Sequence, residues 1–462
     1  MHAPAWLLAL ALLDVMTIAP AQAQGNLPGT PPPVVGHDQP RRDDSSGPRV
    51  RFIPSIRIDL TKLFNLAAEE PTHEPGQVLV LWPDEDSARD GQAWIAQREQ
   101  LQPAELHALP NLGGVLSMYA LADAAQALSL RQRLRAAQPS WVVDLNALAT
   151  PQQRDDAAGP VQAAPAAAKP RLYALAMLGL KPAPPATSDL RDGLRVGVID
   201  SALDARMLQP PAAGWWNGRA PLQHSVLAST DTPAPNGHGH QVALLLAGAS
   251  LPNGFTGAAP ATQLQWVAVM RRVGEVTSTN SLLLARAMDW LLGQRVQLIN
   301  LSAGGAGDDI LRSVVGQLVA RDVVLVAAAG NKPDASAVYP AAYAGVWAVT
   351  AVDARGQVYG RASRGAHVSF AAPGVEVWVP DPMRSDGNLD APLGSYVSGT
   401  SFATALTSGA LARLGADFWS QSAAARKAML CRAARPATQA QAVLGCGLLN
   451  LEALAPSLQA RP

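Results

Sequence analysis

The stretch SGTSFATA, residues 398–405, places a serine after a Gly-Thr pair and before an Ala-rich run that favours a helix. At the start of a helix, backbone N–H groups and the helix dipole stabilise a negatively charged oxygen. Ser401 is therefore a candidate nucleophile, although a serine in this position commonly serves only as an N-cap.

Two further stretches supply groups that a serine nucleophile requires. In VGVIDSALD, residues 196–204, Asp200 ends an apolar strand, where an ionised carboxylate needs a donor such as an imidazole N–H. In NGHGHQVA, residues 236–243, His238 precedes an apolar helical run and is a candidate general base that we expect to be exposed at the helix start. Taken alone, such an Asp usually begins a turn and such a His is usually structural.

A fourth candidate ends another apolar strand, in AAAGN at residues 327–331. The side-chain amide of Asn331 and the backbone N–H of Ser401 together could form an oxyanion hole. Asn after Gly is otherwise typical of a turn.

The chain from about residue 190 to residue 455 alternates apolar strands with helical stretches. The strands VGVI, LQWVAVM, VQLINLS and VVLVAAA are rich in Val, Leu and Ile along their whole length rather than at alternate positions, which predicts an α/β fold with a parallel sheet covered by helices on both faces. In such sheets ligands bind beyond the carboxyl ends of the strands, where Asp200 and Asn331 stand.

This region resembles the catalytic domain of the subtilisin-like serine peptidases (subtilases, peptidase family S8). The resemblance rests on the stretches VGVIDSALD, NGHGHQVA and SGTSFATA, which supply Asp, His and Ser in that order. It also rests on AAAGN and on LINLSAGG at residues 298–305. The blocks GAAP, YPAAY, AVTAVD and FAAPGVEVW also fall at the places expected of the family. The resemblance implies a subtilisin-like sheet.

The resemblance also assigns roles to individual residues. It implies a catalytic triad of Asp200, His238 and Ser401, with Asn331 in the oxyanion hole. It further implies that the segment 302–304, namely Ser302, Ala303 and Gly304, pairs with a peptide substrate in β-fashion.

Three positions depart from the family pattern. Ala202 replaces the usual Gly after the Asp, His240-Gln241 replaces Thr-His after the catalytic His, and Ala405 replaces Pro after the Ser. His240 is a nearby competitor of His238 for the role of base, but the alignment of HGHQVA with the family frame places that role on His238. None of the four reacting groups is lost.

The implied chemistry is acyl transfer without a metal or an organic cofactor. The loop SLPNGFTG, residues 250–257, has no carboxylate cluster, so we expect no specific metal ion there.

The N-terminus resembles a secretory signal peptide, residues 1–23, with the apolar run AWLLALALL and the small-residue pattern Ala-Gln-Ala before Gln24. The absence of Lys and Arg before the run and the Asp14 carboxylate depart from that pattern, and a buried N-terminal helix is the alternative. We expect export to the periplasm or the medium. No later apolar stretch reaches about 18 residues, so no membrane span is expected in the mature chain.

The chain after residue 23 divides into four predicted segments. We expect a flexible segment at 24–74, a small α+β domain at 75–150, an Ala/Pro linker and lead-in at 151–189, and the catalytic domain at 190–462. The strand at 141–145 should complete a β-α-β-β-α-β order, which resembles the ferredoxin-like propeptide of subtilases docked on the catalytic domain in cis.

An ordinary accessory domain is the alternative for this small domain. A propeptide would be cut within or just before the linker stretch 151–170.

Cys431 and Cys446 are the only cysteines of the chain. In an oxidising compartment they could form a disulfide. For the length of the loop between them, such a bond would stabilise the fold by about 3 kcal/mol. Two unpaired buried thiols are the alternative.

The composition excludes some partners. With 36 basic and 36 acidic side chains, the bulk charge does not favour nucleic acid. The hypothesis that follows is an exported, self-processing endopeptidase that acts on peptides or proteins, with a weak preference for apolar or uncharged residues before the cleaved bond.

A catalytically silent subtilase fold used for binding is the alternative function. An α/β-hydrolase esterase is excluded, because Ser401 is not in G-x-S-x-G and the chain order differs.

Overall fold

The fold is taken from a computed structural model, whose described residues are 71–152, 162–163, 173–181, 194–208, 212–235, 237–260, 262–333, 337–385, 388–390, 392–436 and 441–454. The expected signal peptide at 1–23 and nearly all of the segment 24–74 lie outside these residues. No helix in the described ranges is long and apolar enough to cross a membrane.

The first part of the described chain has the element order predicted from the sequence, β-α-β-β-α-β. Its strands pair antiparallel in the order β2-β3-β1-β4. The elements are β1 (His73–Trp82), α2 (Glu85–Glu99), β2 (Glu105–Leu109), β3 (Gly114–Ala120), α3 (Ala124–Ala137) and β4 (Val142–Pro151).

Local chemistry fixes both helices of this part. Asp84 and Asp123 are N-caps whose carboxylates accept the backbone N–H of Ser87 and of Gln126, at 2.7 and 2.8 Å. The helices cover one face of the sheet, and its core includes Trp82, whose indole N–H donates to Ser117 Oγ at 2.7 Å.

Strand β4 is twice as long as the predicted strand 141–145 and ends inside the predicted linker 151–189. Its second half leaves β1 and pairs antiparallel on one side with β10 (Val276–Asn280) and on the other with β12 (Ala303–Gly305). The strand runs six residues beyond its predicted end at Leu145, because pairing with the distant strands β10 and β12 holds NALATP extended, an interaction that local composition does not record.

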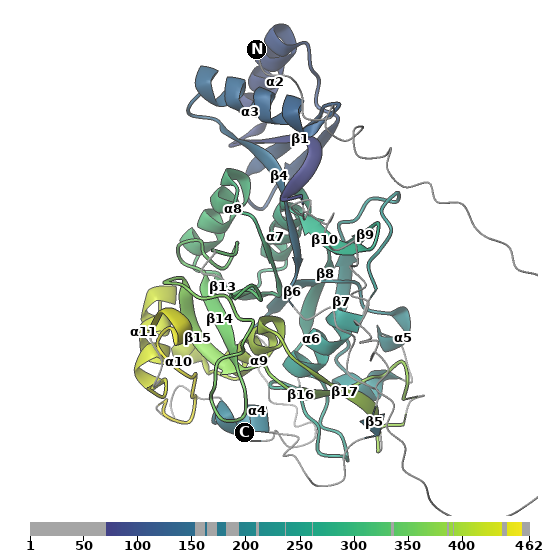
Figure 1. Cartoon of the computed structure of the whole chain (residues 1–462), viewed down its shortest axis with the longest axis vertical. Coiled ribbons are helices and arrows are strands. Elements are labelled where there is room, and N and C mark those ends of the chain that lie inside the picture. Colours follow the sequence, from purple (N-terminus) through teal and green to yellow (C-terminus); the bar gives the residue numbers. More distant parts are fainter. Residues whose placement is uncertain are drawn as a thin grey trace, which may run out of the picture. The chain divides into compact units, whose positions relative to one another are not determined.

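The main sheet has seven strands, all parallel, in the order β15-β14-β13-β11-β6-β8-β7 (Figure 1). Their bounds are β6 (Val196–Asp200), β7 (Leu222–Ser225), β8 (Leu264–Ala268), β11 (Leu298–Leu301), β13 (Val324–Ala328), β14 (Trp347–Val352) and β15 (Val368–Pro373). The predicted parallel sheet is confirmed.

The sheet is buried on both faces because its strands alternate between two cores. Val196 and Val198 of β6 face α6 (Gly237–Ala247) and α9 (Thr400–Ala412), whereas Ile199 faces α7 (Ser281–Gly293) and α8 (Asp309–Ala320). This two-sided burial explains why the inner strands are mostly apolar, whereas the edge strand β7 (LQHS) is largely exposed.

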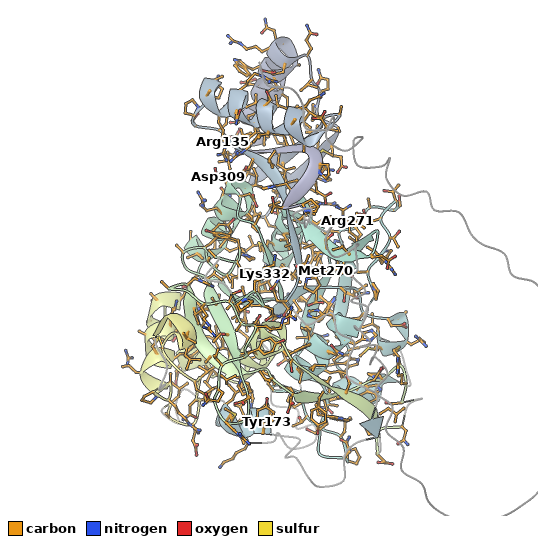
Figure 2. All side chains as sticks on the ribbon, viewed as in Figure 1. Arg135, Tyr173, Met270, Arg271, Asp309 and Lys332 are labelled. Atoms are coloured by element: carbon orange, nitrogen blue, oxygen red, sulfur yellow. A yellow bond between two sulfur atoms is a disulfide. The ribbon has the colours of Figure 1, made fainter. Side chains whose placement is uncertain are left out.

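Several elements escaped the sequence prediction. Within the predicted linker lie β5 (Gln162–Ala163), which pairs with β17 (Leu393–Val397), and α4 (Tyr173–Met177). Tyr173 donates its hydroxyl to the carbonyl of Val375 at 2.5 Å (Figure 2). Further unpredicted elements are α5 (Ala205–Leu208), the 3-10 helix η2 (Ala212–Trp216), β9 (Arg271–Val273) and β16 (Val377–Pro380).

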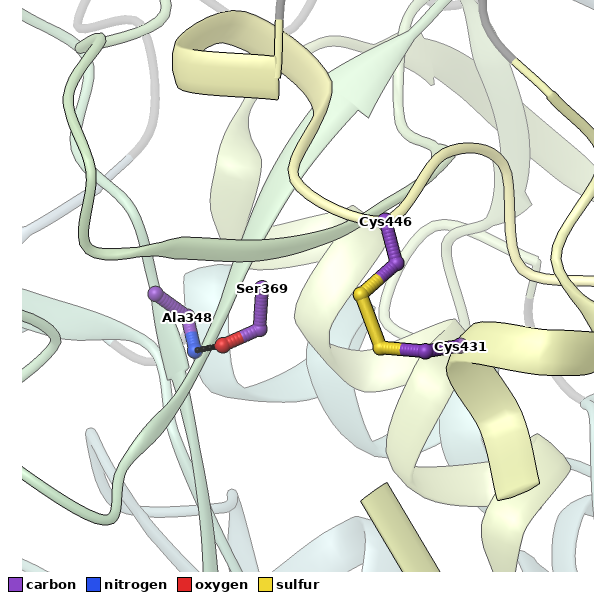
Figure 3. The surroundings of a disulfide bond; sticks show 4 residues. All are labelled: Ala348, Ser369, Cys431 and Cys446. Carbon is purple, nitrogen blue, oxygen red and sulfur yellow. Dashed lines mark hydrogen bonds between the residues drawn. A yellow bond between two sulfur atoms is a disulfide. The ribbon is translucent and has the colours of Figure 1, made fainter. Parts of the chain in front are cut away.

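The C-terminal part folds back on the main sheet through α10 (Ala416–Trp419), α11 (Ala423–Ala433) and α12 (Gln441–Leu444). Cys431 in α11 is disulfide-bonded to Cys446, with an S–S distance of 1.97 Å (Figure 3). Cys446 N also donates to the carbonyl of Ser369 in β15 at 2.9 Å. The bridge therefore ties α11 to the sheet edge.

Candidate active site

Asp200 is the last residue of β6, which lies between β11 and β8 inside the parallel sheet. Its side chain is fully buried. Its Oδ1 accepts hydrogen bonds from the Ser201 backbone N–H at 2.7 Å and from the His238 ring nitrogen Nδ1 at 2.7 Å. The ordered carboxylate thus fixes the imidazole with Nδ1 as the donor, so that in the neutral ring Nε2 is the acceptor.

His238 lies in the first turn of α6 and is buried, with 6% of its surface exposed, rather than exposed as the sequence predicted. Gly239 explains the close approach of this helix to β6: a Cβ at this position would lie 2.7 Å from Ser201 Oγ. Ser201 Oγ accepts the Gly239 N–H at 3.0 Å. Nε2 of His238 is buried and has no hydrogen-bond partner among the described residues.

His240 points to a different partner. Its Nε2 accepts the backbone N–H of Asp204 at 3.0 Å, and burial lowers the pKa of His240 to about 4. A neutral His240 therefore holds the loop after β6 and leaves the contact with Asp200 to His238.

Ser401 is the second residue of α9, a helix buried on all sides, and is itself fully buried. Its Oγ lies 2.6 Å from the carbonyl oxygen of Gln152 and 3.0 Å from that of Ser302. The backbone N–H of Ser401 also donates to the Gln152 carbonyl at 3.2 Å. A main-chain carbonyl thus stands directly at this serine.

Asn331 follows β13, with its side chain held in one orientation. Its Oδ1 accepts the backbone N–H of Thr400 at 3.1 Å and the Thr400 hydroxyl at 3.0 Å. Its Nδ2 is buried and, within the described ranges, has no hydrogen-bond partner. The Nδ2 amide of Asn331 can therefore donate a hydrogen bond to another group beside the start of α9.

The segment 302–304 pairs with β4 of the same chain. The register is Ala303 opposite Pro151 and Gly304 opposite Thr150, and Ser302 O accepts the Gln152 N–H at 2.9 Å. This antiparallel pairing delivers the Gln152 carbonyl to Ser401.

The structure brings the side chains of Asp200 and His238 into contact and seats one carbonyl at Ser401. It does not join Ser401 to His238: in the described chain, the serine hydroxyl donates to carbonyl oxygens and the imidazole Nε2 is unpaired. Cys431 and Cys446 are bonded to each other in the C-terminal part.

The sequence analysis missed Gln152, Ser201 and Thr400. The segment NALATP before Gln152 does not alternate between apolar and polar residues, and the short polar side chains of Ser201 and Thr400 act through hydrogen bonds that leave no pattern in the sequence. The described residues include no group of three or more His, Cys, Asp or Glu side chains that could hold a metal ion.

Comparison with known proteins finds that the model of the Subtilase family matches residues 191–447. A probable subtilase-type serine protease of Deinococcus radiodurans is 30% identical over 251 residues, which are 48% of this chain and 33% of that protein. The chain thus spans about a third of that relative's length. Subtilisin DY of Bacillus licheniformis is 30% identical over 267 residues, 57% of this chain and 90% of that protein.

Among solved structures, fervidolysin from Fervidobacterium pennivorans, described as a keratinolytic enzyme related to subtilisin, matches with a TM-score of 0.62. The match has 21% sequence identity and covers 83% of this chain and 61% of the other. At this identity the likeness concerns the fold.

Proposed function

Because the chain belongs to the subtilase family, we propose that it is an exported serine endopeptidase made as a self-processing precursor. It hydrolyses peptide bonds in peptides or proteins through Asp200, His238 and Ser401. The observation that carries the proposal is the Gln152 carbonyl at Ser401, presented by a strand that pairs as a peptide substrate would.

The reaction is acyl transfer. Ser401 Oγ attacks a carbonyl carbon and gives its proton to Nε2 of His238. The Nδ1–H of His238 remains hydrogen-bonded to the Asp200 carboxylate. The serine hydroxyl first turns from the carbonyl oxygens that it now contacts toward the unpaired Nε2.

The oxyanion then accepts hydrogen bonds from the Ser401 backbone N–H and from Nδ2 of Asn331. The C–N bond breaks, the amine leaves with the proton from the imidazolium, and water hydrolyses the ester by the same proton transfers.

We assign the segment 75–150 to folding and inhibition of the rest of the chain. Its contacts with the helix starts support this role: Asn146 Oδ1 accepts the Leu282 N–H of α7 at 3.1 Å, and Asp144 Oδ2 accepts the Asp309 N–H of α8 at 2.9 Å. Arg135 pairs with both Asp144 and Asp309 (Figure 2). Acceptors at helix N-termini are favourable partners.

Export is supported by the signal-peptide pattern of residues 1–23 and by the Cys431–Cys446 bond, because disulfides persist in oxidising compartments. The product would be periplasmic or secreted.

The test is the variant Ser401→Ala, which should accumulate as the full-length precursor. Ser420→Ala, at an exposed position after α10, is the control and should be processed normally. Normal processing of Ser401→Ala would rule out self-processing through this serine.

A catalytically silent binding fold is the second candidate, favoured by the missing contact between Ser401 and His238. A fluorophosphonate probe separates the two functions. Covalent labelling of the processed protein at Ser401 supports the peptidase, and absence of labelling supports the silent fold.

A further inference from the structure

The side chain of Gln152 is bound as specifically as its carbonyl. Gln152 is buried, with 8% of its surface exposed, although glutamine side chains are usually solvated. Its amide oxygen Oε1 accepts the backbone N–H of Asn331 at 3.0 Å. Its amide nitrogen Nε2 donates to the carbonyl oxygens of Gly304 and Thr150, both at 3.0 Å.

All three partners are main-chain groups, so their donor or acceptor character is fixed by the backbone. The atom facing the Asn331 N–H must be an acceptor, and the atom facing the two carbonyls must be a donor. An amide at this length meets both demands. A glutamate would direct an oxygen at two carbonyl oxygens, and an aliphatic side chain would leave the Asn331 N–H and the Gly304 carbonyl without this partner.

Val338 packs against both Gly304 and Gly330. A Cβ at Gly304 would lie 2.3 Å from Val338 Cγ1, and a Cβ at Gly330 would lie 2.6 Å from Val338 Cγ2. The valine therefore fills the space between the two backbone segments that contact Gln152.

We propose that the primary specificity pocket, formed by Gly304, Gly330–Asn331 and Val338, selects glutamine, and that the chain cleaves itself on the carboxyl side of Gln152. This inference rests on the proposed peptidase activity. In the first turnover, Ser401 Oγ forms an ester with the Gln152 carbonyl carbon, and the following amide nitrogen leaves with the proton held by His238. Water then releases Gln152 as a carboxylate.

The first experiment uses the wild-type enzyme after processing and fluorogenic peptides with the sequence Leu-Ala-Thr-Pro-Gln before the scissile amide. Matched peptides carry Glu, Leu, Phe or Lys in place of Gln. We expect kcat/KM for the Gln peptide to exceed each of the others by at least about fivefold, the factor for one unpaired main-chain group at about 1 kcal/mol.

The second experiment identifies the processed ends by mass spectrometry. The released N-terminal fragment should end at Gln152, and Gln152→Glu should slow processing by a similar factor. Val338→Gly should raise kcat/KM for the Phe peptide relative to the Gln peptide, because it removes the side chain between Gly304 and Gly330.

The outcomes separate the two levels of the proposal. If Ser401 is labelled by the fluorophosphonate and any peptide is cleaved, but Gln is not preferred or the fragment does not end at Gln152, the glutamine pocket is refuted while the peptidase stands. If nothing is labelled or cleaved, the peptidase is refuted and the pocket with it.

Discussion

Asp289 offers a test of the N-terminal domain that leaves the candidate active site untouched. This residue of α7 is buried, and its Oδ1 accepts the backbone N–H groups of Asn111 and Leu112, both at 2.9 Å. Its Oδ2 accepts Nδ2 of Asn111 at 3.2 Å. One carboxylate thus binds the whole turn between β2 and β3.

The expected effect of Asp289→Ala follows from these contacts. A hydrogen bond to a charged group contributes about 1.5–3 kcal/mol, and the three bonds share one carboxylate, so their energies do not add. Water also rehydrates the separated partners. We expect a loss of about 2–3 kcal/mol, which raises the dissociation constant of the processed N-terminal fragment roughly 30- to 150-fold.

The assay is dilution of the processed complex, with peptide hydrolysis recorded against concentration. The midpoint of activation should move to higher concentration by that factor in Asp289→Ala. Glu275→Ala is the matched control, since the Glu275 side chain is 91% exposed and pairs with Arg272, and its midpoint should not move. At full dilution all three proteins should have the same kcat/KM.

An unchanged midpoint in Asp289→Ala, with normal fluorophosphonate labelling, would show that the turn contact does not hold the fragment. A reduced kcat/KM at full dilution would show instead that α7 supports the active site, which contradicts the separation of the two roles.

Two further predictions concern single side chains of the catalytic part. Asn331→Ala should lower kcat by about 10²- to 10³-fold with little change in KM, a magnitude measured in subtilisin itself. Thr400→Val removes one of the two hydrogen bonds to Asn331 Oδ1 and should lower kcat less in the same assay. Equal losses of kcat in the two variants would contradict the assignment of Asn331 to the oxyanion hole. His240 has a folded-state pKa of about 4 against 6.5 in a model peptide, so the unfolded chain binds a proton that the folded chain does not between these values. The contribution of the neutral His240 to the free energy of unfolding is complete above pH 6.5. It is lost as the pH falls to about 4, which lowers the free energy of unfolding by up to about 3 kcal/mol. In a Ser401→Ala background, His240→Gln should reduce the difference between the unfolding free energies at pH 7 and pH 4.5, and an unchanged difference would contradict the burial of a neutral imidazole.

The sequence predicted the residues whose position depends on the strand that they follow. Asp200 ends β6 and Asn331 follows β13, and parallel strands bring their carboxyl ends to one edge of the sheet, so the position of both residues at that edge follows from topology. The burial of His238 did not follow, because the residues that cover an imidazole come from other parts of the chain.

Gln152 shows the same limit more sharply. Its segment has the composition of a linker, and the contacts that make it a strand come from β10 and β12, which lie more than a hundred residues further along the chain. Pairing between such distant edges carries no local signal. The amide of Gln152 likewise finds partners in Gly304 and Asn331, which neither periodicity nor spacing connects to it.

In the proposed self-processing, these contacts would let one segment act as both substrate and inhibitor. Cleavage after Gln152 changes the bond at its carbonyl and leaves the pairing with β12 and the three amide contacts in place. A free peptide can make these contacts, but it lacks the bonds of Asn146 to α7 and of the 111–112 turn to Asp289. The proposal therefore places the control of fragment release in contacts remote from Ser401, and substitutions there should change activation without changing turnover.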